Sequence, residues 1–94
     1  IKIILKHKNL EKLEKASNWL SEALKNHFKD QLIGPESPII PRIKNKFIKN
    51  ILIKIPVSKN LTKSKKLLEK SFKSFKMISL FRNIDILIDV DPYN

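Results

Sequence analysis

The chain has no cysteine and only one glycine among its 94 residues. Without cysteine it cannot form a disulfide, a thiolate nucleophile or a zinc site built on cysteine. A glycine-rich loop that holds nucleotide phosphates needs at least two glycines, so this kind of site is excluded as well. The two histidines, His7 and His27, have no partner near them in the sequence, and we assign neither a zinc-binding nor a catalytic role. We therefore expect no cofactor and no enzymatic activity in this chain.

Acidic residues are also scarce. Nine Asp and Glu stand against twenty Lys and Arg, which gives a net charge of +11. Such an excess is typical of proteins that bind nucleic acid or another acidic surface. All but two of the basic residues are lysine, and isoleucine and asparagine are abundant, as in the products of AT-rich coding sequences. Part of the charge therefore reflects composition, and the positions of the lysines carry more information than their number.

Long apolar runs are missing too. The longest, such as residues 3–5 and 51–53, fall far short of the ~20 residues that span a bilayer, and no signal-peptide pattern is present. We expect a cytoplasmic protein that makes no contact with membranes. The length suits one small domain, and the chain begins directly on a strand-like segment, which favours a piece of a longer protein.

The first third of the chain predicts a strand and a long helix. Residues 1–8 are rich in β-branched side chains, as an opening strand would be. Asn9 is a suitable N-cap, and from Leu10 onward apolar residues recur every three or four positions along one face of a helix of about five turns. This face consists of Leu10, Leu13, Ser17, Leu20, Leu24 and Phe28.

The middle of the chain predicts a β-hairpin. The only glycine and three prolines fall within residues 34–41, so the segment 32–43 must be extended or irregular. Residues 44–46 are predicted to form a turn, because asparagine tolerates a positive φ. This turn joins residues 39–43 to the strongest strand signal of the sequence, residues 47–55.

The last third predicts a second helix and a closing strand. Pro56 ends the hairpin, and Asn60 or Thr62 is a suitable cap for the helix. Apolar residues at every second position from Ile84 to Val90 predict a strand. The apolar face of the helix consists of Leu61, Leu68, Phe72 and Phe75, with Leu67 at its edge.

The resulting order β-α-β-β-α-β is that of a split βαβ, ferredoxin-like sandwich. In this α+β fold an antiparallel sheet carries both helices on one face. We expect residues 1–94 to form this single domain, with the tip of the hairpin directed away from the helices and free to reach a partner.

Three segments also carry a family resemblance. Leu32-Ile33-Gly34-Pro35 opens a proline-bearing loop, residues 41–53 combine basic residues, a turn, an aromatic residue and an apolar strand, and Ile88-Asp89-Val90-Asp91-Pro92 closes the chain. In this order and spacing they resemble the C-terminal domain of PriA, the family of primosomal replication-restart helicases also called primosomal protein N-prime. Residues 1–8 fit the preceding family segment. The hairpin departs from the family pattern at Asn45, Lys46 and Ile48, where glycine, arginine and a further basic residue are usual.

The resemblance implies a larger parent protein, an ATP-dependent 3′ to 5′ DNA helicase that reloads the replisome at stalled forks. ATP, magnesium and zinc would be bound only by lobes upstream of this chain. For the chain itself it implies a fold similar to that of ribosomal protein S-ten, binding of forked and single-stranded DNA, and docking onto the upstream helicase lobes. It also implies a part in receiving the acidic tail of single-stranded DNA-binding protein. From the residues alone, a protein-interaction module and a ribosomal-type RNA-binding domain remain alternatives.

Two groups of basic residues are candidates for DNA contact. The first surrounds the predicted turn, where positive charge could neutralise phosphates and Phe47 could stack on a base. The alternative is a solvated turn over a buried Phe47, since a phenylalanine at the start of a strand is usually part of the core. The second lies along one face of the second helix, where lysines three or four apart indicate either a polyanion opposite them or compositional bias. The first group is Arg42, Lys44, Lys46 and Lys49, and the second is Lys63, Lys66, Lys70 and Lys73 with Lys65 and Lys76 flanking.

Further residues are assigned to tail binding or to packing. Lys59 and Lys63 lie at the start of the second helix, where free amides favour an anion, and are candidates for binding the acidic tail. Asp89 and Asp91 share a strand face but have no third ligand nearby, so we expect no metal site there. Trp19 borders the apolar face of the first helix, and we expect it to pack at the sheet border or against the helicase lobes.

Overall fold

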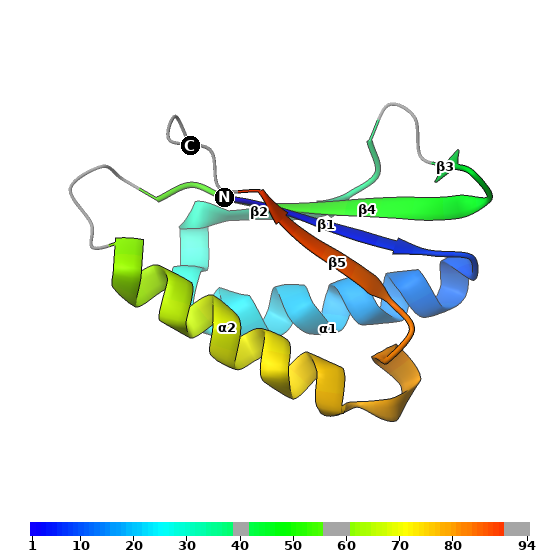
Figure 1. Cartoon of the computed structure of the whole chain (residues 1–94). Coiled ribbons are helices and arrows are strands. Elements are labelled where there is room, and N and C mark those ends of the chain that lie inside the picture. The colour runs from blue at the N-terminus through cyan, green and yellow to red at the C-terminus, as the bar shows by residue number, and fades with distance from the viewer. Residues whose placement is uncertain (39–41, 56–60, 90–94) are drawn as a thin grey trace.

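The computed structural model describes residues 1–38, 42–55 and 61–89 of the chain (Figure 1). A short 3-10 turn follows each of the two helices, η1 (Lys29–Gln31) after the first and η2 (Ser79–Phe81) after the second. In chain order the main elements are β1 (Lys2–His7), α1 (Leu10–Phe28), β2 (Leu32–Glu36), β3 (Arg42–Ile43), β4 (Lys46–Ile53), α2 (Leu61–Met77) and β5 (Asp85–Asp89).

The strands form one antiparallel sheet in the order β2-β4-β1-β5, and the short strand β3 pairs with β4. Helix α1 connects β1 to β2, and β4 is inserted between these two strands, which is the defining feature of a split βαβ unit. Both helices lie on the same side of the sheet (Figure 1). The predicted α+β fold is confirmed. No helix in the described ranges is long and apolar enough to cross a membrane.

The core lies between this sheet and the helices. Alternate residues of β1 face it, so Ile3 and Leu5 are fully buried while Lys2, Ile4 and Lys6 lie on the helix-free face. The predicted face of α1 is buried except at its first residue, Leu10, which is 40% exposed because it precedes the first turn that meets the sheet. The predicted N-cap is confirmed, since the Asn9 side chain accepts a hydrogen bond from the amide of Lys12.

The conformation of the glycine-proline segment depends on Gly34. Its φ is +107°, and a Cβ atom at this position would lie 2.8 Å from the backbone oxygen of Asn50 on β4. The pairing of β2 with β4 shifts register between Ile33 and Glu36, and the Ser21 hydroxyl donates a hydrogen bond of 3.3 Å to the Gly34 carbonyl oxygen. A side chain would therefore strain the backbone and push β2 away from β4.

The second strand of the fold differs from the prediction. The structure places it at Leu32–Glu36, whereas the hairpin arm that we expected at residues 39–43 is reduced, among described residues, to the two residues of β3. Residues 39–41 lie outside the described ranges. Proline disrupts a helix but is tolerated in an edge strand, and the extended segment around Pro35 can therefore join the sheet as β2.

The predicted turn is confirmed. Lys44 and Asn45 have φ of 50° and 65°, so both central residues of this two-residue turn adopt positive φ, the arrangement that matches the twist of a hairpin. Strand β4 begins at Lys46, which we expected in the turn, one residue before the predicted start of the strand. It ends at Ile53, two residues before the predicted end. The closing strand is described from Asp85 to Asp89, and Val90 lies outside the described residues.

Helix α2 buries two serines as well as the expected aromatic and leucine side chains. Ser64 and Ser71 are buried beside Leu68 and Phe75, whereas Phe72 is only half-buried. Asn60 and the side chain of Leu61 lie outside the described part of the chain.

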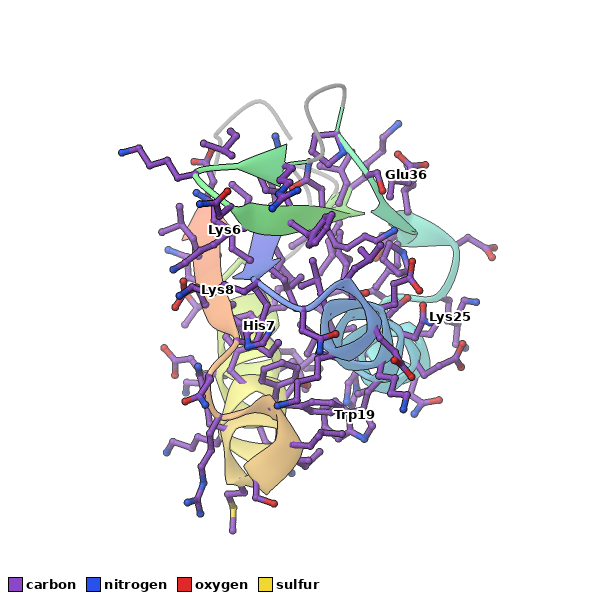
Figure 2. The ribbon with its side chains drawn as sticks, turned by 90° about the vertical axis from the view of Figure 1, so that its right-hand side faces the viewer. Lys6, His7, Lys8, Trp19, Lys25 and Glu36 are labelled. Carbon is purple, nitrogen blue, oxygen red and sulfur yellow. The ribbon has the colours of Figure 1, made fainter. Side chains whose placement is uncertain are left out.

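Trp19 joins the two helices. Its ring centroid lies 5.9 Å from that of Phe75 and 6.1 Å from that of Phe81, and the rings of Phe75 and Phe81 stack at 5.0 Å. Trp19 thus packs between α1, α2 and η2 rather than at the sheet border (Figure 2).

Candidate nucleic-acid interface

The basic residues predicted around the hairpin do not form one surface. Lys46 and Lys49 are three positions apart on β4, so they point to opposite faces of the sheet. The Lys46 ammonium lies 2.7 Å from the Asp85 carboxylate on β5. The Lys49 side chain is only 17% exposed and contacts the Ser37 hydroxyl at 3.0 Å and the Glu14 carboxylate at 4.0 Å. Lys49 is therefore largely engaged on the helix side of the sheet.

The turn itself presents Arg42 and Lys44. The Arg42 guanidinium lies over the Phe47 ring, 5.1 Å from its centroid, and its Nη2 donates a weak hydrogen bond of 3.5 Å to the Asn45 side chain. Lys44 is exposed, and no described residue forms an ion pair with it. Phe47 is half-buried against the core and covered by Arg42, so base stacking by its ring finds no support in this geometry.

A basic cluster that sequence reasoning missed surrounds Asp85. Lys6 is its cross-strand neighbour, Lys46 is its ion-pair partner, and Lys76 and His7 lie close enough to act on its charge. The hydrogen bond from Lys46 is the largest cause, and it lowers the pKa of Asp85. Slight burial opposes it, and the positive charges of Lys46 and Lys76 add to the lowering. The carboxylate therefore stays ionised at pH values at which an ordinary aspartate begins to be protonated.

This cluster had no local signal in the sequence. Its members come from β1, β4, the last turn of α2 and β5, and only the sheet register brings them together. Figure 2 views the end of the sheet where they meet, with Lys6 and Lys8 beside β5 and Lys25 on the opposite side of the molecule.

The two helices differ in how their charges are balanced. On α1, Lys15 lies 3.6 Å from Glu11 and Lys25 lies 3.9 Å from Glu22. On α2 the only acidic residue is Glu69, and it forms no ion pair with a described residue. Four exposed lysines of α2 have neither an ion-pair nor a hydrogen-bond partner among the described residues, namely Lys65, Lys66, Lys70 and Lys73. Lys76 is exposed without an ion pair to a described residue as well, but its ammonium donates a hydrogen bond of 2.8 Å to the Ile84 carbonyl oxygen.

The helix-free face of the sheet carries a shallow apolar groove of about 400 Å³. Ile4 and Ile48 form part of its floor, Ile43 is 46% exposed beside it, and Lys2 and Lys6 stand at its rim. Asn50 also lines the groove, and its buried side-chain oxygen accepts no hydrogen bond from the described residues. Pro38 completes the lining.

In a comparison with known protein families, the model of the primosomal protein N C-terminal domain matches residues 1–93. The chain belongs to this family. Membership links the chain to the C-terminal region of the primosomal protein PriA, and thereby to replication restart. Comparison with curated protein sequences gave no match.

The remaining candidate residues of this PriA C-terminal domain are Lys59, Lys63, Asp89 and Asp91. Lys59 lies outside the described residues, and Lys63 is exposed in the first turn of α2. Asp89 is exposed on β5, whereas Asp91 also lies outside the described part. Within the described ranges no three His, Asp or Glu side chains are grouped so that they could hold a metal ion.

Proposed function

We propose that this domain binds the sugar-phosphate backbone of forked and single-stranded DNA without base specificity. In this role it is an accessory and docking domain of the PriA helicase, and ATP hydrolysis, magnesium and zinc belong to upstream lobes. We propose no reaction for the chain itself, because its described residues contribute positive surfaces and do not group a nucleophile with an acid and a base.

The observation that carries this proposal is the unbalanced lysine face of α2. Lys66, Lys70 and Lys73 are exposed, three or four residues apart, and without ion-pair partners among the described residues. Like charges at this spacing repel one another. A polyanion relieves that repulsion, and its binding is strengthened by the release of counterions.

The dimensions of the lysine face suit a DNA strand. Ten residues separate Lys63 from Lys73, so the face is about 15 Å long at the helical rise per residue. Phosphates of one strand advance 3.4 Å each along a duplex axis, so this length runs past about four of them. Lysine is well suited to such contacts, since its ammonium acts as a point charge with no requirement for a particular base.

The exposed turn offers a second contact. Arg42 and Lys44 project from the end of the hairpin, and neither forms an ion pair with a described residue. Replacing both by alanine should weaken binding to all DNA sequences alike and flatten the dependence of log K on log salt by about 2 units. Fluorescence anisotropy with a forked duplex measures this, and an unchanged slope would remove the turn from the interface.

The apolar groove favours a second function, the reception of the acidic tail of single-stranded DNA-binding protein. Apolar side chains of the tail would lie over Ile4 and Ile43, and its carboxylates would meet Lys2 and Lys6. Charge complementarity between an acidic peptide and this rim is the reason for choosing this occupant.

A tail-peptide titration separates this groove from the start of α2. If the groove is the site, the double variant Lys2→Ala and Lys6→Ala should lower the affinity for the tail peptide at least about fivefold, as expected for loss of two charge-assisted contacts. Lys59→Ala with Lys63→Ala should leave it unchanged. The reverse pattern would assign the tail to the start of α2, and no effect of either pair would reject both sites.

A further inference from the structure

A separate pocket lies at the end of the sheet shown in Figure 2, where β1 ends, β4 begins and the chain enters β5. It has a volume of about 270 Å³. Four potential hydrogen-bond donors and one carboxylate line it, and they come from three separate segments of the chain. These residues are His7, Lys8, Lys46, Asn83 and Asp85.

The His7 ring is held in a defined orientation. The backbone N–H of Asn9 donates to Nδ1 of His7 at 3.0 Å. Because Nδ1 is the acceptor in this bond, the neutral ring carries its proton on Nε2. No described residue forms a hydrogen bond with Nε2, so this N–H is available to a ligand in the pocket.

We propose that this pocket binds one backbone phosphate of a nucleic acid. Nε2–H of His7 and the side-chain amide of Asn83 would donate to its oxygens, and Lys8 and Lys46 would supply positive charge. The non-bridging oxygens of a backbone phosphate are strong acceptors, and they can take donors that arrive from several directions.

Asp85 gives the pocket its specificity. In the free domain this carboxylate already occupies Lys46 at 2.7 Å, so a second carboxylate would only replace the one that is tethered there. A phosphate in a DNA strand can instead draw Lys46 away from Asp85, because the neighbouring phosphates of the same strand contact other lysines, such as Lys44. The inference therefore rests on the proposed DNA-binding function, and it assigns Asp85 the role of a competing anion.

Inorganic phosphate tests the pocket without DNA. At constant ionic strength, with chloride exchanged for phosphate, saturable NMR shifts should appear at the amides of His7, Lys8 and Asn83. His7→Ala should weaken the apparent affinity about threefold to tenfold, as loss of one charge-neutral donor predicts, and His7→Gln, which keeps a donor near the Nε2 position, should restore most of it. Shifts that rise linearly or spread over all lysines would overturn the site.

DNA titrations distinguish this inference from the broader proposal. Lys8→Ala should reduce the salt slope by about 1, whereas the control Lys25→Ala on the opposite side should not change it. Asp85→Asn should strengthen DNA binding about threefold to tenfold, because it removes the competitor for Lys46. If DNA binds but these variants behave like the control, the pocket is wrong and the DNA-binding function stands. If phosphate saturates the pocket and DNA does not bind, the proposed function fails.

Discussion

Substitutions in the lysine face of α2 should weaken DNA binding without lowering the stability of the domain. The variant replaces Lys66, Lys70 and Lys73 by alanine. Their neighbours along the face are at spacings of three and four residues, and each like-charge pair costs a few tenths of a kcal/mol. Alanine also has the higher helix propensity. The free energy of unfolding should therefore stay constant or rise by up to about 1 kcal/mol.

The same variant should lose DNA affinity. If each of the three lysines neutralises one phosphate, the slope of log K against log salt falls by about 2.7, which corresponds to about a hundredfold or more in affinity near 0.1 M salt. Anisotropy titrations of a forked duplex at several salt concentrations measure the slope. Urea denaturation measures the stability of the same samples.

A control with the same loss of charge separates contact from net charge. Lys12→Ala, Lys15→Ala and Lys25→Ala remove three lysines from α1, where two of them are paired with glutamates. This control should reduce the slope far less than the α2 variant. Equal slopes for the two variants would mean that only the total charge matters, and the assignment of an interface to α2 would be refuted.

Three further predictions concern single sites. The Asp85 carboxyl should titrate below the usual range of an aspartate, and Lys46→Ala should raise its pKa, which carbon-detected NMR can measure. Because the pKa of Asp85 is lower in the folded state, the ion pair stabilises the fold above the unfolded pKa of about 3.9. This stabilisation disappears as the pH falls through the folded pKa. Gly34→Ala should destabilise the domain by about 2–5 kcal/mol in urea, through a strained φ and the contact with the Asn50 oxygen, and a loss below about 1 kcal/mol would contradict that geometry. Trp19 emission should shift on unfolding but not on DNA binding, since the half-buried ring packs against Phe75 and Phe81. A shift on DNA binding would place Trp19 in the interface.

The order of the elements could be predicted because each had a local signal. Periodicity defined both helices, Asn9 marked the start of α1, and the turn at Lys44 and Asn45 followed from the residue types that accept positive φ. Strand β2 was misplaced because its pairing depends on Gly34, whose close approach to β4 is a tertiary contact. Proline suggested an irregular loop there, yet the same residue is compatible with an edge strand.

The candidate site was harder to predict than the fold. A helix places lysines at fixed angles, so the face of α2 could be read directly from the spacing. A hairpin does not collect neighbouring residues on one surface, and Lys46 and Lys49 therefore separated to opposite faces. The cluster around Asp85 depends on which residue of β1 stands opposite which residue of β5, and a single sequence does not contain that register.

Comparison of the two helices helps to separate function from composition. Both helices were encoded with the same bias toward lysine, yet α1 carries three lysines and three glutamates whereas α2 carries six lysines and one glutamate. A bias that acts on the whole chain would raise lysine on both helices and would not remove acidic partners from only one of them. The excess on α2 is therefore tied to its position, on the side of the helix that faces away from the core. This difference makes α2, more than the net charge of +11, the reason to look for DNA on this surface.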